Sequence, residues 1–508
     1  MTEAVQIVWF KRDLRLRDHA PLAEACRVSE PTLLLYIIEP MLINDQHFDI
    51  RHWRFITQSI TDMNEQLKAY DANVTLVIGD AEPAFEAIAK QFDISHVLSY
   101  EEIGLDNTFQ RDKRLQEWFK QRDIDWIEFA NGGVTRGLNH RRSWKQQWHH
   151  YLKQPVQDPV LDAIQATEIA KLGNPLTLNN ELIAYQIQTS IDVASSFEAL
   201  TEPAQSFQPG GEKRAWYTLN HFLTERGINY AQQISNPSLA RESCSRLSPY
   251  LAWGNITSRQ VINRISNKKS QTEWRHTVKA FSSRIQWRSH FMQKFESECS
   301  MQFTPVNKAY ENYPYVEHSE AVDRVTAWQQ GKTGFPLIDA CMRAVIATGY
   351  LNFRMRAMLV SFLTHHLNVD WREGVTFLGR QFLDFEPGIH YPQFQMQASV
   401  TGTNTIRLYN PLKQALDHDK DGRFTRKWLP ELTEVPDDLI HSPWKLSDME
   451  QGLYCVKLGK DYPYPIIDFE IASREARDRL WTFRKREDVK QEGRRILRKH
   501  TIPGSPRT

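Results

Sequence analysis

The chain has 508 residues, 41% of them hydrophobic and 25% charged, which are the proportions of a globular protein with room for two or three domains. No apolar window approaches a membrane span and the N-terminal segment lacks a signal-peptide layout, so we expect a cytoplasmic protein without a membrane partner. The net charge of +1 indicates no polyanion partner by itself, although residues 471–508 hold 12 Lys and Arg against 5 Asp and Glu.

The five cysteines are scattered along the chain, and no two of them form a Cys-x-x-Cys pair. The sequence therefore predicts neither a zinc site nor an iron–sulfur cluster, and we expect no bound metal. Reduced thiols are the default state in the cytoplasm.

Residues 1–130 alternate short apolar runs with stretches rich in Glu, Lys, Gln and Arg. This alternation is typical of a doubly wound parallel sheet with helices between its strands. No Gly-x-Gly-x-x-Gly follows the first run, so the usual dinucleotide fingerprint is missing. The predicted strands span residues 5–10, 32–39, 74–79, 96–100 and 125–129.

Residues 131–211 are predicted to connect this α/β domain to a second domain. Over most of this segment prolines are frequent, aromatic residues are few and no period is clear, and it ends at Pro209-Gly210-Gly211. Helices dominate from residue 212 to residue 508.

Two helices of this second domain are well marked. Over residues 336–350 apolar side chains recur at helical spacing, with Pro336 suited to the first turn and Gly349 to the end. A second apolar stripe covers residues 371–382. The stretch FLDFEPGIHYPQFQMQ (382–397) follows it, and its Pro-Gly pair predicts an interruption of helix there. An ordinary buried loop is one interpretation of this stretch, and a binding wall is the other.

Three segments, in this order, resemble the cryptochrome/photolyase family. VWFKRDLRLRDHAPL (8–22) is similar to the start of the family, SRLSPYLAWGNITSRQ (245–260) to its flavin-phosphate segment, and residues 328–374 to its core helices. Residues 407–432 continue the match, which covers most of the chain apart from 151–210. The resemblance implies an N-terminal α/β antenna-type domain and an all-α C-terminal domain that binds FAD and DNA.

The resemblance also implies a set of FAD-binding residues. A folded FAD needs a diphosphate cradle, an apolar slot and polar partners at the ring edge. Hydroxyls and an Arg suit the cradle, although a plain helix cap would use the same serines. An Arg held by a carboxylate suits the ring, where negative charge develops on reduction. The matching positions are Tyr230, Ser245, Arg246, Ser248, Arg356, Asp384 and Glu386, the last where the family usually has Asp.

Several positions depart from the family pattern. His390 stands where the family places Asn beside the reactive flavin nitrogen, and a histidine could deliver a proton there. A slip of one residue would instead turn His390 away. On the lesion side Trp287 and Arg354 keep the pattern, whereas Arg284 replaces the usual Glu and Phe353 the usual Asn.

The electron route departs as well. Of the three tryptophans that commonly lead from the flavin to the surface, only Trp371 is clear, because Phe394 and His318 take the other two places. Tyr391, Tyr350 and Tyr315 are candidate substitutes, and simple packing is the alternative for each. The antenna is open too: YEEIGLDN (100–107) lacks the acidic and amide pair of folate-binding relatives, so a second chromophore of unknown identity, or none, remains.

Two functions follow from the resemblance. The first is a light-driven DNA photolyase, a carbon–carbon lyase of the deoxyribodipyrimidine photo-lyase type that splits pyrimidine dimers in single- or double-stranded DNA by electron transfer from reduced FAD. The candidate catalytic residues are Arg284, Trp287, Arg354, Trp371 and His390. The second is a cryptochrome-like blue-light photoreceptor with a signalling partner and little or no repair. In both cases we expect a monomer, and neither the lesion type nor the antenna follows from the sequence.

Overall fold

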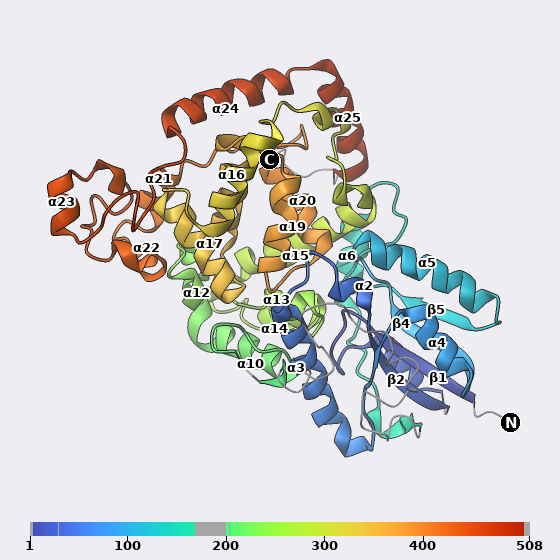
Figure 1. Ribbon diagram of the computed structural model, residues 1–508. Coiled ribbons are helices and arrows are strands. Elements are labelled where there is room, and N and C mark those ends of the chain that lie inside the picture. The colour runs from blue at the N-terminus through green and yellow to red at the C-terminus, as the bar shows by residue number, and fades with distance from the viewer. Residues whose placement is uncertain (1–3, 29, 168–199, 203, 502–508) are drawn as a thin grey trace.

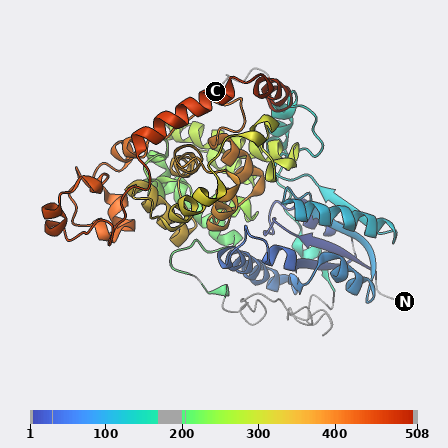
Figure 2. The ribbon, with the colours of Figure 1, turned by 45° about the horizontal axis from the view of Figure 1, so that its top comes forward.

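The computed structural model describes residues 4–28, 30–167, 200–202 and 204–501, and it consists of an α/β part beside a larger helical part (Figures 1 and 2). Strand order in the sheet is β3-β2-β1-β4-β5, and every neighbouring pair is parallel. The predicted α/β fold followed by a helical half is confirmed. The strands are β1 (Ala4–Phe10), β2 (Pro31–Ile38), β3 (Thr75–Ile78), β4 (Asp93–Tyr100), β5 (Asp125–Phe129) and β6 (Gln165–Ala166), which pairs with β2.

The two faces of the sheet belong to different cores, because successive side chains of a strand point to opposite faces. Ile7 and Trp9 of β1 pack with Phe85 of α4 and Phe119 of α5 in a core confined to the α/β part. Phe10 faces the other way and joins a core that continues through the helical part. The two parts therefore share one hydrophobic interior. The helices of this part are α1 (Ala20–Ala25), α2 (Pro40–Ile43), α3 (Ile50–Leu67), α4 (Ala81–Ala89), α5 (Asp106–Lys120) and α6 (Trp144–Lys153).

The helical part surrounds the long α15, which packs along α20. Helices α21 to α23 project to one side, and α24 and α25 lie across the top of the view in Figure 1. The main helices are α10 (Glu212–His221), α11 (Tyr230–Gln233), α12 (Ala240–Ser243), α13 (Ser248–Ala252), α14 (Ser258–Ser266), α15 (Arg275–Glu296), α16 (His318–Gln330), α17 (Pro336–Thr348), α18 (Phe353–Ser361), α19 (Arg372–Gln381), α20 (Pro387–Gln397), α21 (Pro411–His418), α22 (Arg423–Trp428), α23 (Asp448–Leu453), α24 (Phe469–Arg484) and α25 (Glu487–His500).

The predicted ends of α17 are confirmed. Pro336 occupies the first turn, where a missing N–H costs no hydrogen bond. Gly349 ends the helix with φ of +67°, a left-handed conformation that a residue without a Cβ adopts without strain.

The predicted interruption of helix at Pro387 and Gly388 is wrong, because α20 begins at Pro387. Proline is well suited to this first helical position. A Cβ on Gly388 would lie 3.1 Å from the Cα of Met292, so the glycine lets α15 and α20 approach closely. Glycine thus serves helix packing here and does not end a helix.

Part of the segment between the two halves is structured. Helix α6 packs on α14, and β6 pairs with the first two residues of β2. The rest of the predicted connector, 168–199 and 203, lies outside the described residues. None of the helices in the described ranges has the length and apolar character that a membrane crossing needs.

Candidate functional site

A large cavity opens in the helical part between α13, α15, α18 and α20. It contains about 1190 Å³ of space free of protein atoms, part of which is open to solvent. A smaller cavity shares Phe353, Arg356, Asp384 and Glu386 with it and extends the space to His390 and Phe394. The two cavities therefore form one site, with a deep end at α20 and a mouth at α15 and the start of α18.

The deep end is organised around an ion pair. Arg356 donates from Nη1 and Nη2 to the two oxygens of Asp384 at 3.0 and 2.9 Å, and from Nε to the Leu351 carbonyl at 2.7 Å. Burial alone would raise the pKa of Asp384, but the charge and hydrogen bonds of Arg356 outweigh it and hold this pKa below its ordinary value. A fixed positive group thus faces the cavity beside an ionised carboxylate.

A second ion pair closes the same wall. Arg288 of α15 donates from Nη2 to Oε1 of Glu386 at 2.6 Å and to the carbonyl of Leu251. Burial raises the pKa of Glu386, although the charges of Arg288 and Arg12 oppose the shift. Sequence reasoning missed Arg288, whose only signal was its place one helical turn after Arg284 on the same face.

The segment before α13 lines another part of the cavity wall. Arg246 has φ of +59° and donates from Nε and Nη2 to Oε1 of Gln208 at 3.1 and 2.8 Å. Its guanidinium lies 3.6 Å from the ring centre of Tyr350. Ser245 and Ser248 line the cavity beside it, and a hydrogen bond from Ser248 contributes to the low pKa of Asp384. Hydroxyls and a guanidinium therefore gather where the sequence predicts a phosphate cradle.

The mouth is lined by side chains that reach solvent. Trp287 and Phe353 are 38% and 36% exposed, and the guanidinium of Arg284 lies 5.6 Å from the Trp287 ring centre. Tyr230 is buried beneath them, where a hydrogen bond from Arg284 opposes the rise of its pKa that burial causes. Arg354 is not among the lining residues and donates to Gln414 of α21 at 3.3 Å.

His390 lines the deep end with one ring nitrogen committed to the backbone. Its Nε2 lies 2.7 Å from the carbonyl oxygen of Val375, so Nε2 carries the proton. Burial lowers the pKa of His390 to about 3, which keeps the ring neutral. Its Nδ1 then has a lone pair and no proton, so the ring can accept a hydrogen bond at Nδ1. This geometry does not support the expected proton delivery by His390.

The rings behind this wall form a buried group. Tyr391 lies 5.9 Å from the ring centre of His390 and 6.4 Å from that of Trp371, both in edge-to-face arrangements. Trp371 is 1% exposed and lies outside the cavity, whereas Phe394 lines it. His318 begins α16. Of the three candidate tyrosines, Tyr391 is thus in ring contact with both the cavity wall and Trp371.

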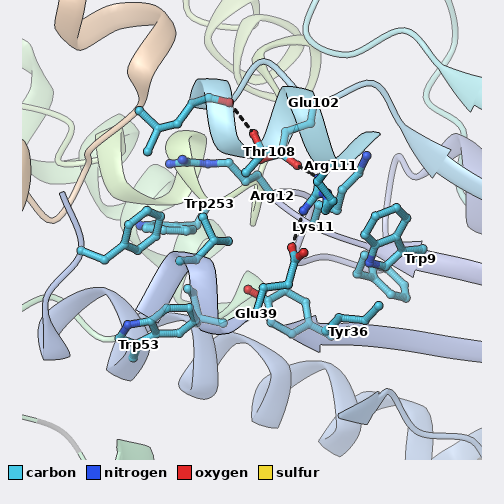
Figure 3. Close-up of a pocket in the computed structure, with 16 residues that line it drawn as sticks. Trp9, Lys11, Arg12, Tyr36, Glu39, Trp53, Glu102, Thr108, Arg111 and Trp253 are labelled. Atoms are coloured by element: carbon cyan, nitrogen blue, oxygen red, sulfur yellow. Dashed lines mark hydrogen bonds and ion pairs between the residues drawn. The ribbon is translucent and has the colours of Figure 1, made fainter. Parts of the chain in front are cut away.

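A further cavity lies at the carboxyl ends of β1 and β2, beside the point where strand order reverses (Figure 3). Ligands of open α/β sheets commonly bind at such a point. Six aromatic side chains line this cavity: Trp9, Phe10, Tyr36, Phe48, Trp53 and Trp253.

Charged side chains line the rest of this strand-end cavity. Arg111 pairs with Glu39, and with Glu102 at 2.6 Å. Burial raises the pKa of Glu39 to about 7 against the opposing charge of Arg111. Arg12 lies 4.3 Å from the ring centre of Trp253 and donates to the Phe385 carbonyl, so the cavity connects the sheet to the start of α20.

The large cavity fits an FAD on two observations. Its walls combine the polar groups above with apolar side chains at Leu251, Phe281 and Ile285. In addition, two buried polar atoms that belong to lining residues, Oδ1 of Asn352 and Nε of Arg288, meet no hydrogen-bond partner among the described residues. Such atoms are costly unless a ligand or water satisfies them. In the described part of the chain no group of three His, Cys, Asp or Glu side chains could hold a metal ion.

Comparison with known proteins connects both halves to one family. Residues 6–137 match the model "DNA photolyase" and residues 281–482 match "FAD binding domain of DNA photolyase". A deoxyribodipyrimidine photo-lyase of Alkalihalophilus pseudofirmus is 27% identical over 94% of this chain and 97% of its own length. A cryptochrome DASH of Gloeobacter violaceus is 25% identical over 92% and 94%.

Solved structures share the fold. A bacterial class III photolyase from Agrobacterium tumefaciens superposes with a TM-score of 0.77 at 22% identity and covers 96% of this chain and 99% of its own. An archaeal photolyase from Sulfolobus tokodaii, whose structure holds two FAD molecules, gives 0.75 at 22% identity over 94% and 100%.

Proposed function

Because the chain belongs to the cryptochrome/photolyase family, we propose that it is a light-driven DNA photolyase that binds FAD in the large cavity and receives a damaged base at its mouth. The observation that carries the proposal is the contrast within this cavity. Paired charges line its deep end, and exposed aromatic and basic side chains rim its mouth. The substrate would be a pyrimidine dimer in single- or double-stranded DNA, and the reaction a carbon–carbon bond cleavage.

FAD supplies light absorption and one-electron transfer when it is bound. The chain's residues would hold it at both ends. Arg246, Ser245 and Ser248 would bind the phosphates, where their hydroxyls and positive charge suit an anion. Arg356 would stabilise negative charge at the ring, because Asp384 fixes its guanidinium in place.

The remaining wall residues would set the hydrogen bonds at the ring. Glu386, held by Arg288, offers a carboxylate acceptor. His390 offers a second acceptor at Nδ1, because its Nε2 proton is donated to Val375. Both groups therefore favour ligand atoms that carry a proton.

The mouth would receive the lesion after it leaves the DNA stack. A flipped base costs a few kcal/mol of stacking and pairing, least for a damaged pair. Trp287 and Phe353 would stack on the base, and Arg284 would neutralise a flanking phosphate. Arg354 would act indirectly, because its guanidinium is turned toward Gln414.

A photoreceptor with the same cofactor is the second candidate, and one observation favours it. The carboxylates that line the cavity, Asp384 and Glu386, are both paired with arginines at the deep end, and the mouth residues offer no acid that could assist bond cleavage. In that case the exposed aromatic rim would contact a signalling partner.

The strand-end cavity would hold a second chromophore. Aromatic walls and buried carboxylates suit a planar ring with hydrogen-bond donors. Chromatography of the chromophores released by denaturation would identify it, and Trp53→Ala is expected to lower its amount while the amount of FAD stays unchanged. Release of FAD as the sole chromophore from the wild-type chain would contradict the proposal.

The repair assay separates the two functions. The purified chain with chemically reduced flavin is mixed with oligonucleotides that carry one cyclobutane or one (6-4) lesion, single- and double-stranded. Lesions are counted after blue light and after the same time in the dark. Light-dependent loss of one lesion type is expected; flavin-loaded protein that repairs neither would contradict the photolyase and support the photoreceptor.

A further inference from the structure

A hydrogen-bonded chain of three side chains crosses the interface between the two halves behind the cavity wall. The hydroxyl of Tyr391 on α20 lies 2.7 Å from Nε2 of His47, and Nδ1 of His47 lies 2.7 Å from Oδ1 of Asp45. Asn107 donates to the other oxygen of Asp45 at 3.0 Å. Tyr391 and His47 are 2% and 6% exposed, so bulk water does not compete for these bonds.

The direction of the hydrogen bonds follows from Asp45. Its carboxylate can only accept, so Nδ1 of His47 carries a proton, and in the neutral tautomer that matches this bond Nε2 carries none. Nε2 of His47 then presents a lone pair, and the Tyr391 hydroxyl donates to it. Stacking on Phe385, with ring centres 5.0 Å apart and planes at 13°, holds the imidazole in this orientation.

This arrangement matters because an oxidised phenol is a strong acid. Burial raises the pKa of Tyr391, so the resting side chain keeps its proton. Loss of an electron is favourable only when the proton leaves at the same time to a base within hydrogen-bond distance. His47 is such a base, and Asp45 stabilises the imidazolium that forms.

Tyr391 also lies where an electron donor to the cavity is needed. It follows His390, which lines the deep end, and the two ring centres are 5.9 Å apart. Phe394 lines the same wall and is not readily oxidised. On its other side Tyr391 contacts the buried Trp371, and the Arg372 guanidinium lies 5.9 Å from that indole.

We propose that Tyr391 is a redox-active tyrosine that reduces a light-excited oxidised flavin in the cavity, with His47 as the acceptor of its proton. This inference rests on the proposed flavin site. One electron leaves the phenol for the flavin, the O–H bond of Tyr391 breaks, and an N–H bond forms at Nε2 of His47. The products on the protein are a neutral tyrosyl radical and an imidazolium paired with Asp45. An external thiol reductant supplies the electron that resets Tyr391, and His47 returns the proton.

The test is electron paramagnetic resonance of the oxidised, flavin-loaded full chain, frozen under blue light. Wild-type protein grown with ring-deuterated tyrosine identifies the radical without any substitution, because deuteration narrows a tyrosyl signal. We expect this signal in the wild type and its loss in Tyr391→Phe. Tyr310→Phe removes another buried tyrosine, one that packs on Phe483 away from the cavity, and should keep the signal.

A second variant tests the base. His47→Gln keeps a polar side chain of similar reach but takes up no proton, and it should lower the radical yield by about 100-fold. A wild-type signal that deuterated tyrosine leaves unchanged would overturn the proposal, as would an undiminished signal in Tyr391→Phe or His47→Gln.

Failure of the inference and failure of the proposed function have different signatures. The repair assay uses chemically reduced flavin and does not need Tyr391, so repair without a tyrosyl radical overturns this inference alone. A radical without repair supports the inference and counts against the photolyase. A purified chain without flavin absorbance overturns both.

Discussion

The two ends of the large cavity differ in the burial and the charge of their side chains. At the deep end Arg356 and Arg288 are paired with Asp384 and Glu386, and these groups are largely withdrawn from solvent. At the mouth Trp287 is exposed and its neighbours reach water. Satisfied, buried charges fix one ligand in one pose, whereas exposed aromatic side chains accept a ligand that comes and goes. Under the proposed function, the deep end would therefore be the cofactor site and the mouth the site where substrate is exchanged.

The largest effect is expected from breaking the deep-end pair. Asp384→Ala leaves the guanidinium of Arg356 without its carboxylate in a largely buried wall, and should lower the free energy of unfolding by about 3 kcal/mol. It should also abolish co-purification of flavin. Denaturant unfolding and the absorbance of the purified chain measure the two effects.

The matched control for this change is Asp370→Ala. Asp370 makes a similar pair with Arg372, but their side chains are 24% and 35% exposed. Its loss should cost about 0–1 kcal/mol and leave the flavin content unchanged. Equal losses of stability in the two variants would remove the distinction between the deep-end pair and a surface pair.

The next largest effect tests whether the mouth of the cavity binds DNA. Trp287→Ala should weaken binding of lesion-containing DNA by about 1–3 kcal/mol, the value of stacking one base on an aromatic ring. Folding stability should change by less than about 0.5 kcal/mol, since the side chain is 38% exposed. Titration with fluorescent oligonucleotides gives the affinity. Trp481→Ala, which removes a 50% exposed tryptophan on α24, serves as control, and equal weakening in both variants would exclude a specific role of the mouth.

A pH effect that is smaller for each pH unit tests the role of His390. The pKa of His390 is about 3 in the folded protein and about 6.5 in the unfolded chain. Between these pH values His390 is protonated in the unfolded chain but not in the folded, flavin-free chain. Stability is therefore lost as the pH falls from about 6.5 toward 3, by at most about 1.4 kcal/mol per pH unit for one histidine. His390→Asn should reduce this slope in unfolding measured at several pH values. An unchanged slope would show that His390 takes up its proton at the same pH in the folded and the unfolded chain, so that folding does not lower its pKa.

The smallest effect is expected at Trp371. Trp371→Phe removes an oxidisable ring that touches Tyr391 but not the cavity, so photoreduction of the flavin should slow less than in Tyr391→Phe. The rate of flavin bleaching under blue light with a thiol reductant measures it. A slower rate in Trp371→Phe than in Tyr391→Phe would make the tryptophan the main donor.

How much the sequence predicts depends on how local the cause is. The strands of the sheet and both ends of α17 follow from apolar periodicity and from Pro336 and Gly349, which act within a turn or two. Helix α20 was missed because Gly388 looks like a helix breaker until its contact with Met292 is seen.

The site shows the same limit. The resemblance predicts Arg356 with Asp384, and the structure pairs them, but Arg288 and the link between Tyr391 and His47 are contacts over 98 and 344 residues. No local pattern marks such contacts, because tertiary packing alone brings the partners together.

The most direct test of the central claim is whether the mouth receives a base while the deep end holds the flavin. A fluorescent 2-aminopurine placed opposite a cyclobutane dimer becomes bright when the dimer leaves the stack. We predict a rise in fluorescence when flavin-loaded protein binds this duplex in the dark, and no rise with Trp287→Ala. Tight binding by the wild-type, flavin-loaded protein without any rise would contradict the account, since the mouth would then contact DNA without receiving a base.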